Sequence, residues 1–269
     1  MKRVMLTVAY EGTNYHGWQR EPTGITIEEV LNRELSRLLG EEILVSGASR
    51  TDAGVHALGN LCVLDTESPI PPEKIAPALL GRMPEDIVVT RSEEVAPDFH
   101  PRRCDSVKCY EYTIYRGRFP NPLCRRTSLH FYRPLEPALM QQAGAFLVGE
   151  HDFKSFCAAG SQAESTVRRI LSLQVTEDSA FLRIQVRGTG FLYNMVRIIA
   201  GTLIQAGLGR LDPLALPGIL EGKNRELAGP TAPPEGLCLM GIELFPEGFP
   251  PGLLGKGDQY GSQEKALSQ

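Results

Sequence analysis

The sequence predicts an α+β protein built from two halves, each a split βαβ unit with a largely antiparallel sheet. Three observations lead to this prediction. Apolar residues alternate with period two in several short segments, segments with helical periodicity lie between them, and the order strand, helix, strand, strand, helix, strand occurs twice. The two copies share this pattern but not their residues. We expect helices on one face of each sheet and a cleft lined by the other.

The first half opens with a strand at residues 3–10, where apolar and polar residues alternate. Thr26 then stands three residues before Glu29, which is the spacing of a capping box. Apolar residues recur at helical intervals from Ile27 until Gly40 ends the pattern. We therefore expect a helix that begins after Thr26 and ends at Gly40.

Shorter signals predict the remaining elements. In the first half they are strands at residues 43–45 and 61–64, a helix that begins near Pro72, and a strand at residues 87–89. In the second half they are a strand at residues 107–115, a helix at 137–148, strands at 170–175 and 181–186, a helix at 191–206 and a strand at 237–244. We place the halves at residues 1–105 and 106–246. Residues 247–269 are rich in Pro, Gly and polar residues and are predicted to be a flexible tail.

Composition limits the class of protein. No apolar run reaches the roughly eighteen residues of a membrane-spanning helix, and the start MKRVMLTVAY is not a secretory signal, so we expect a cytoplasmic protein without a membrane partner. The six cysteines form no CxxC pair and no cluster with His, which supports neither disulfides nor a metal site. The formal net charge of -4 means that any nucleic acid would have to bind in a local basic cleft.

The segment SGASRTDAGVHALGN, at residues 46–60, carries the candidate chemistry. It combines Arg50, Asp52 and His56 with small residues that let its backbone approach a ligand closely. The residues alone leave several interpretations open: a surface turn with a solvated ion pair, an acid, base or nucleophile at Asp52, or a metal-dependent hydrolase that uses Asp52 and His56. The metal interpretation lacks third and fourth ligands at a recognisable spacing.

This segment resembles the signature of the tRNA pseudouridine synthase A family in its bacterial form, whose usual order is GRTDAGVHA. Further matches follow in the same order along residues 4–245: YEGTNYHGWQ, DFHPRRCDSVKCYEYTIYR, HDFKSF, GTGFLYNMVRIIAGTL and APPEGLCL. The resemblance implies the pseudouridine synthase fold, with two halves like RNA-recognition-motif or ferredoxin-like units. It also implies a homodimeric isomerase without cofactor or metal, which converts uridine to pseudouridine at positions 38, 39 and 40 of the tRNA anticodon stem-loop.

The resemblance also assigns roles to residues of the site. Asp52 matches the essential carboxylate, which starts the reaction at the ribose by attack on C1′ or by removal of the C2′ proton. Tyr110 matches a tyrosine that stacks on the target base and assists proton transfer at C5, although a strand aromatic is more often a core residue. Arg197 matches the arginine that pairs with the carboxylate, and we expect the pair to lower the pKa of Asp52. From the residues alone, Arg197 could equally be a surface arginine.

The target base must flip out of its stem before the carboxylate can reach its sugar. Arg50 resembles the family arginine that enters the vacated space, and His56 is expected to supply charge or hydrogen-bond donors nearby. Candidates for phosphate contacts, each of which is otherwise an ordinary surface charge, are His16, Arg20, Arg102, Arg103, Lys108, Arg168 and Arg169.

The chain departs from the usual family pattern at four positions. Ser49 stands where Gly is common, Asn60 where Gln is common, and Cys109 and Glu111 flank Tyr110 where basic residues are common. The chemistry survives these changes, but another RNA target, such as ribosomal RNA, stays open. A non-catalytic RNA-binding module stays open as well, although no strand has the aromatic pattern of an RNA-recognition motif.

Overall fold

The computed structural model describes residues 1–254 of the 269-residue chain. Its strands are β1 (Lys2–Tyr10), β2 (Ser46–Gly47), β3 (His56–Thr66), β4 (Ile87–Val95), β5 (Asp105–Tyr115), β6 (Leu129–His130), β7 (Gly149–Asp152), β8 (Val167–Asp178), β9 (Phe181–Gly188) and β10 (Leu237–Phe245). Its α-helices are α1 (Ile27–Leu39), α2 (Pro72–Leu79), α3 (Pro137–Ala145), α4 (Met195–Gly207) and α5 (Leu216–Gly222). The α+β prediction is confirmed.

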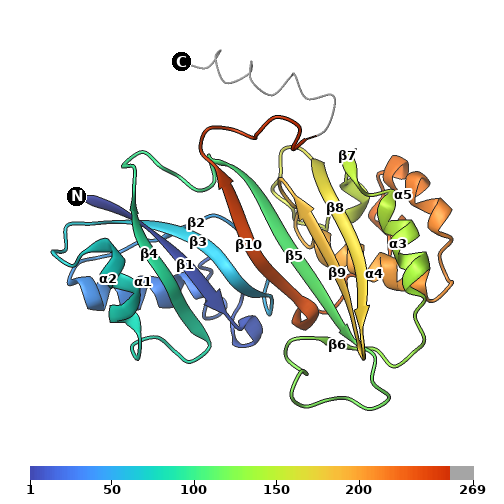
Figure 1. Cartoon of the computed structure of the whole chain (residues 1–269), viewed down its shortest axis with the longest axis horizontal. Coiled ribbons are helices and arrows are strands. Elements are labelled where there is room, and N and C mark those ends of the chain that lie inside the picture. The colour runs from blue at the N-terminus through green and yellow to red at the C-terminus, as the bar shows by residue number, and fades with distance from the viewer. Residues whose placement is uncertain (255–269) are drawn as a thin grey trace.

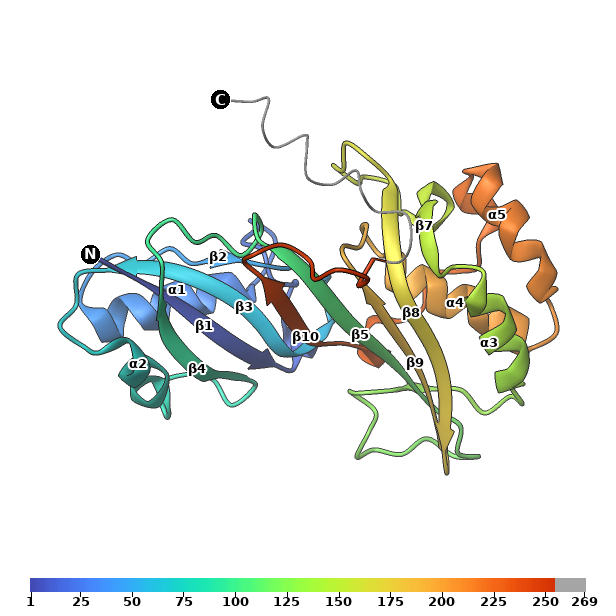
Figure 2. The same cartoon turned by 45° about the horizontal axis from the view of Figure 1, so that its top comes forward.

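Both halves have the strand order of a ferredoxin-like unit (Figure 1). The order is β4, β1, β3, β2 in the first half and β10, β5, β9, β8 in the second, and neighbours within each set of four are antiparallel. The short strand β6 adds a parallel pairing to β5. Alternate residues of β1 and β9 are buried while those between them are partly exposed, so helices cover mainly one face of the sheet. Helices α1 and α4 pass behind the strands in two views (Figure 2).

The two halves share one continuous sheet, whereas the sequence suggested a separate sheet in each. Strand β2 is so short that it covers only Cys62 and Val63 of β3. The beginning of β3 is therefore open, and there His56 and Ala57 pair in parallel with β10. The segment between β2 and β3, which contains Asp52, consequently lies where the halves join.

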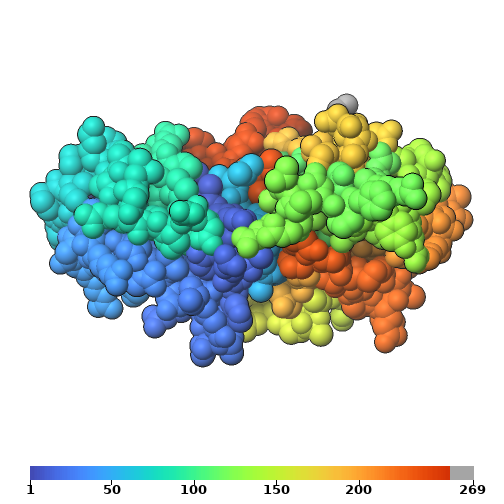
Figure 3. Space-filling view, turned by 90° about the horizontal axis from the view of Figure 1, so that it is seen from below, coloured from blue at the N-terminus to red at the C-terminus, as the bar shows by residue number. Residues whose placement is uncertain are grey.

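A second connection between the halves comes from the segment between β5 and β6. It reaches across to the first half in the space-filling view, where light green atoms meet dark blue ones (Figure 3). The side chain of Arg126 pairs there with Glu11, with 3.3 Å between Nη1 and Oε1.

The helix predicted after Thr26 is confirmed in detail. The Thr26 hydroxyl accepts a hydrogen bond of 3.3 Å from the Glu29 N–H, and Gly40 ends the helix in the left-handed conformation at φ 75°. Residues 43–45 form no strand, which corrects the prediction. The N–H groups of Ile43 and Val45 donate instead to side chains of α1, so they are not available to a ladder.

The second half differs from the prediction at two helix ends. Helix α3 ends at Ala145 rather than at residue 148, and α4 begins at Met195 rather than at residue 191. Asn194 causes the later start, because its left-handed backbone at φ 58° cannot belong to the helix. Within residues 1–254 no helix is both long and apolar enough to cross a membrane.

The predicted tail falls only partly within the described residues. Turns follow β10 at residues 246–247 and 251–254, and Phe249 packs on Phe245 with 5.3 Å between ring centroids. The remainder, residues 255–269, lies outside the described residues.

Candidate active site

Hydrogen bonds fix the segment around Asp52 on both sides of Arg50. The Asn60 side-chain N–H donates to the backbone carbonyl of Ser49 at 3.0 Å and to the hydroxyl of Tyr10 at 3.2 Å. The Tyr10 hydroxyl lies 2.8 Å from the Thr51 hydroxyl. All of these anchoring side chains are buried, while Arg50 is exposed. Arg50 therefore projects from a fixed backbone.

The segment YEGTNYHGWQ packs closely against the same backbone. Gly17 has φ +86°, and a Cβ there would lie 2.5 Å from the Thr51 carbonyl oxygen. A Cβ on Gly12 would lie 2.0 Å from the carbonyl oxygen of Val55. Only glycine fits at these two positions, because the obstructing atoms belong to the backbone. The motif thus supports the segment that carries Asp52.

Asp52 and Arg197 form an ion pair between the halves. Arg197 Nη1 lies 3.7 Å from Asp52 Oδ2, and the two side chains are only 15% and 21% exposed respectively. Arg197 also donates to the carbonyl of Ala232 at 2.8 Å and to the side-chain oxygen of Asn194 at 2.7 Å. These three contacts hold the guanidinium in one orientation, so Arg197 is not the surface arginine that its sequence context allowed.

The pKa of Asp52 departs from its ordinary value in the direction opposite to the prediction. Burial raises this pKa, and the attraction of Arg197 lowers it by less. The sequence shows the partner but not the loss of solvent, which disfavours the charged carboxylate. A partly desolvated carboxylate binds a proton, or attacks a carbon atom, more readily than one in water.

Tyr110 lies beside this pair. Its hydroxyl is 3.1 Å from the Ser49 hydroxyl, and its ring packs edge to face on Phe191 with 5.2 Å between centroids. Burial raises the pKa of Tyr110 to about 12, and the negative charge of Asp52 contributes to the rise. The phenol is therefore protonated at neutral pH.

Tyr112 lies on the same strand face as Tyr110, but its contacts hold the fold together. Its hydroxyl donates to the carbonyl of Pro233 at 2.8 Å, and a Cβ on Gly236 would lie 2.6 Å from its ring. The sequence could not separate these two tyrosines without the family resemblance. Of these two hydroxyls, that of Tyr110 bonds Ser49 in the segment that carries Asp52, and that of Tyr112 bonds Pro233.

His56 is buried and bonded on both ring nitrogens. Nδ1 accepts from the Gly12 N–H at 2.9 Å, and Nε2 lies 3.2 Å from the carbonyl oxygen of Glu235. This pattern requires a proton on Nε2, and burial lowers the pKa of His56, so the ring is neutral. In this structure His56 ties the two halves together rather than offering positive charge at the surface.

The comparisons with known proteins decide the family. A family model described as tRNA pseudouridine synthase matches residues 6–102 and 143–243, which include Asp52 and Arg197. The chain is 46% identical over 243 residues to tRNA pseudouridine synthase A of Ruminiclostridium cellulolyticum, covering 90% of this chain and 99% of that protein. It is also 46% identical over 245 residues to the protein of that name from Moorella thermoacetica, covering 90% and 100%.

The chain belongs to the tRNA pseudouridine synthase family. Tyr110 lies between the two matched segments of the family model, so its assignment depends on the CYEY motif and on its position beside Asp52. Within residues 1–254 of the synthase, no group of three or more His, Cys, Asp or Glu side chains is arranged to hold a metal ion. All six cysteines are unpaired thiols.

The predicted phosphate contacts of the synthase do not form one group. Lys108 follows the strand face of Tyr110, and both burial and the neighbouring charge of Arg168 lower its pKa. Arg102 donates to the Ser46 hydroxyl at 3.1 Å, while Arg103 is exposed. Arg169 pairs with Glu150 at 3.0 Å.

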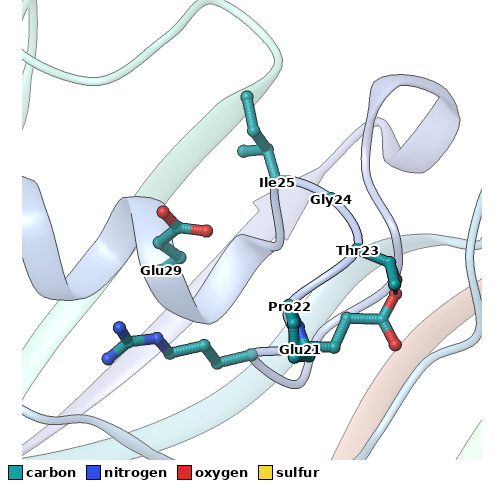
Figure 4. A pocket seen from close by; sticks show the side chains of 7 residues that line it. Glu21, Pro22, Thr23, Gly24, Ile25 and Glu29 are labelled. Atoms are coloured by element: carbon teal, nitrogen blue, oxygen red, sulfur yellow. Dashed lines mark hydrogen bonds between the residues drawn. The ribbon is translucent and has the colours of Figure 1, made fainter.

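His16 and Arg20 lie on a separate loop of the synthase. His16 faces Glu21 at 3.3 Å, and Arg20 borders an open hollow of about 760 Å³ (Figure 4). The hollow is lined by residues 20–25 and Glu29, and none of the three predicted catalytic residues lines it. The reactive groups Asp52, Tyr110 and Arg197 therefore lie outside this hollow.

The sequence did not predict two contacts of the synthase. Asn194 holds Arg197, and its only signal is an Asn directly before an apolar helix, a residue type that tolerates the left-handed conformation. Ser49 contacts Tyr110, although the sequence marks Ser49 only as a departure from the usual Gly.

Proposed function

We propose that this synthase isomerises uridine to pseudouridine at positions 38, 39 and 40 of the tRNA anticodon stem-loop, as a cytoplasmic homodimer. The family and the names of its relatives support tRNA as the substrate. The observation that carries the chemistry is the ion pair between Asp52 and Arg197, at the junction of the halves and beside Tyr110. The stem-loop positions and the homodimer rest on the resemblance described above.

The reaction breaks the bond from N1 to C1′, turns the base and joins C5 to C1′, so no atom is gained or lost. Asp52 starts it at the ribose, by attack on C1′ or by removing the C2′ proton. Arg197 keeps the carboxylate ionised and oriented in spite of its burial. The protonated phenol of Tyr110 supports the base as it turns and can donate a proton to it, but it is a poor base at neutral pH.

Basic residues bring RNA to this site. Arg50 is exposed on a fixed backbone, which suits a side chain that enters a stem after a base has flipped out. Lys108 and Arg168, whose charges lie close to each other, hold a phosphate of the flipped nucleotide. His16, Arg20 and Arg102 are exposed and contact more distant phosphates.

Release of tritium from tRNA that carries [5-³H]uridine tests this function. The hydrogen at C5 passes to water only when C5 becomes bonded to C1′, so release reports isomerisation. We expect release by the wild type in excess EDTA and none by Asp52→Asn, which still binds tRNA.

Each other outcome changes one part of the proposal. Release by Asp52→Asn removes Asp52 from its role, and loss of release in EDTA points to a metal. Binding of tRNA by the wild type without any release leaves an RNA-binding module.

A further inference from the structure

We propose that Ser49 is a positioning residue for the isomerisation, whose hydroxyl holds the phenol of Tyr110 beside Asp52. The inference rests on the proposed function, because it concerns the same site. Its direct observation is the distance of 3.1 Å between the Ser49 and Tyr110 hydroxyls. Both residues are buried, with exposures of 7% and 6%.

The backbone that presents Ser49 is held on both sides. Asn60, which is fully buried, donates to the Ser49 carbonyl at 3.0 Å. The preceding residue, Ala48, donates its N–H to the Leu61 carbonyl at 2.7 Å. Since Asn60 and Leu61 belong to the long strand β3, the connection that carries Ser49 is anchored to the sheet on both sides of the residue. A hydroxyl in such a position can orient a partner from another element.

Tyr110 depends on this contact for the direction of its hydroxyl. Among residues 1–254, Ser49 is the only hydrogen-bond partner of that hydroxyl. Its ring lies against Phe191, which fixes the plane but offers the hydroxyl nothing to bind. Without Ser49, the buried hydroxyl would lack a partner or would turn toward the carboxylate of Asp52.

The direction of the hydrogen bond has a chemical consequence. When Ser49 donates to the phenol oxygen, the proton of Tyr110 is free to point away from Ser49, toward the base that turns beside Asp52. The same donation stabilises the phenolate, and the hydrogen bond from Ser49 accordingly opposes the rise in the pKa of Tyr110. Ser49 thus sets both the position and the proton affinity of a group that faces the substrate. The usual family residue at this position, Gly, has no hydroxyl for this contact.

An experiment without substrate tests the contact itself. In protein labelled with ¹³C at the Cζ of tyrosine, the signal of Tyr110 is the one lost in Tyr110→Phe. We expect Ser49→Ala to shift this signal. The matched control Ser92→Ala should leave it unchanged, because the Ser92 hydroxyl is equally buried but bonds the N–H of Ala76 at 2.9 Å. An unmoved Tyr110 signal in Ser49→Ala overturns the proposal, even if the protein proves to have no synthase activity.

A double-mutant cycle on tritium release tests the role in the reaction. We expect Ser49→Ala to lower kcat about tenfold, with little change in the Kd for tRNA and with the Ser92→Ala enzyme unaffected. In the Tyr110→Phe background, which has no phenol hydroxyl, the same substitution should change kcat less than twofold. A full tenfold loss in that background shows that Ser49 acts on RNA or on Asp52 directly and refutes the positioning role. If the wild type releases no tritium, the proposed function fails, and the NMR experiment still decides the contact.

Discussion

Replacement of Arg197 by Gln removes the charge that opposes the burial of Asp52. At the observed 3.7 Å, two unit charges attract each other by about 4.5 kcal/mol with an effective dielectric constant of about 20. Solvent reaches 21% of the Asp52 side chain, and we reduce the figure to roughly 2 kcal/mol for screening. If this energy supports the reactive carboxylate, kcat/KM at neutral pH falls roughly thirtyfold.

The pH dependence of the variant follows from the same pair. Arg197 lowers the pKa of Asp52, and burial raises it. Without Arg197 the pKa rises further, so a larger fraction of the carboxyl is protonated at any given pH. The acidic limb of the activity profile should therefore move to higher pH, and the deficit of the variant should shrink as the pH rises.

The assay is the rate of tritium release between about pH 5 and pH 9. Arg197→Lys keeps a charge and should retain a limb close to that of the wild type. Arg187→Gln is the matched control, because it breaks an ion pair of 3.1 Å with Glu243 on the opposite sheet face. An acidic limb that stays in place in Arg197→Gln, with an equal loss at every pH, refutes this explanation of the pair.

Three further predictions concern stability and binding. Gly12→Ala should destabilise the fold by about 2 kcal/mol or more in a thermal melt, because its Cβ would lie 2.0 Å from the Val55 carbonyl oxygen. The control Gly218→Ala should not destabilise the fold in this way, because a Cβ at residue 218 meets open space. Asp52→Asn should melt above the wild type at pH 8, since burial raises the pKa of Asp52 in the folded state and the ionised carboxylate then costs stability. The difference should shrink as the pH falls through the folded-state pKa and vanish below the ordinary pKa of an aspartate, and a lower melting temperature of the variant at pH 8 would contradict this reasoning. Lys108→Gln should weaken tRNA binding and reduce by about one the slope of the logarithm of the binding constant against the logarithm of the salt concentration. The control Lys74→Gln, on α2, should leave this slope unchanged, and an unchanged slope in Lys108→Gln would exclude a phosphate contact.

Local signals made much of the fold predictable. The cap at Thr26 and the stop at Gly40 act within a few residues of the chain, so the bounds of α1 follow from sequence. The alternation in β1 and in residues 110–114 of β5 likewise marks which residues face the core. The motif around Asp52 predicted the family, and the comparisons confirm it.

The sequence did not predict which strands pair over long distances in the chain. The junction of the halves depends on contacts between β3 and β10, whose residues lie far apart in the chain. The burial of His56 and the raised pKa of Asp52 both follow from that junction, because it removes solvent that no local pattern reports. Ser49 looked like a minor departure from a motif because its partner, Tyr110, belongs to the other half.

The most direct measurement of the central claim is a pseudouridine map of total RNA by carbodiimide-dependent reverse-transcription stops. The RNA comes from cells that lack the enzyme and is treated with purified wild type or Asp52→Asn. We predict new stops at tRNA positions 38, 39 and 40 with the wild type and none with the variant. Stops only in ribosomal RNA would move the target, and the same stops with Asp52→Asn would contradict the role of Asp52.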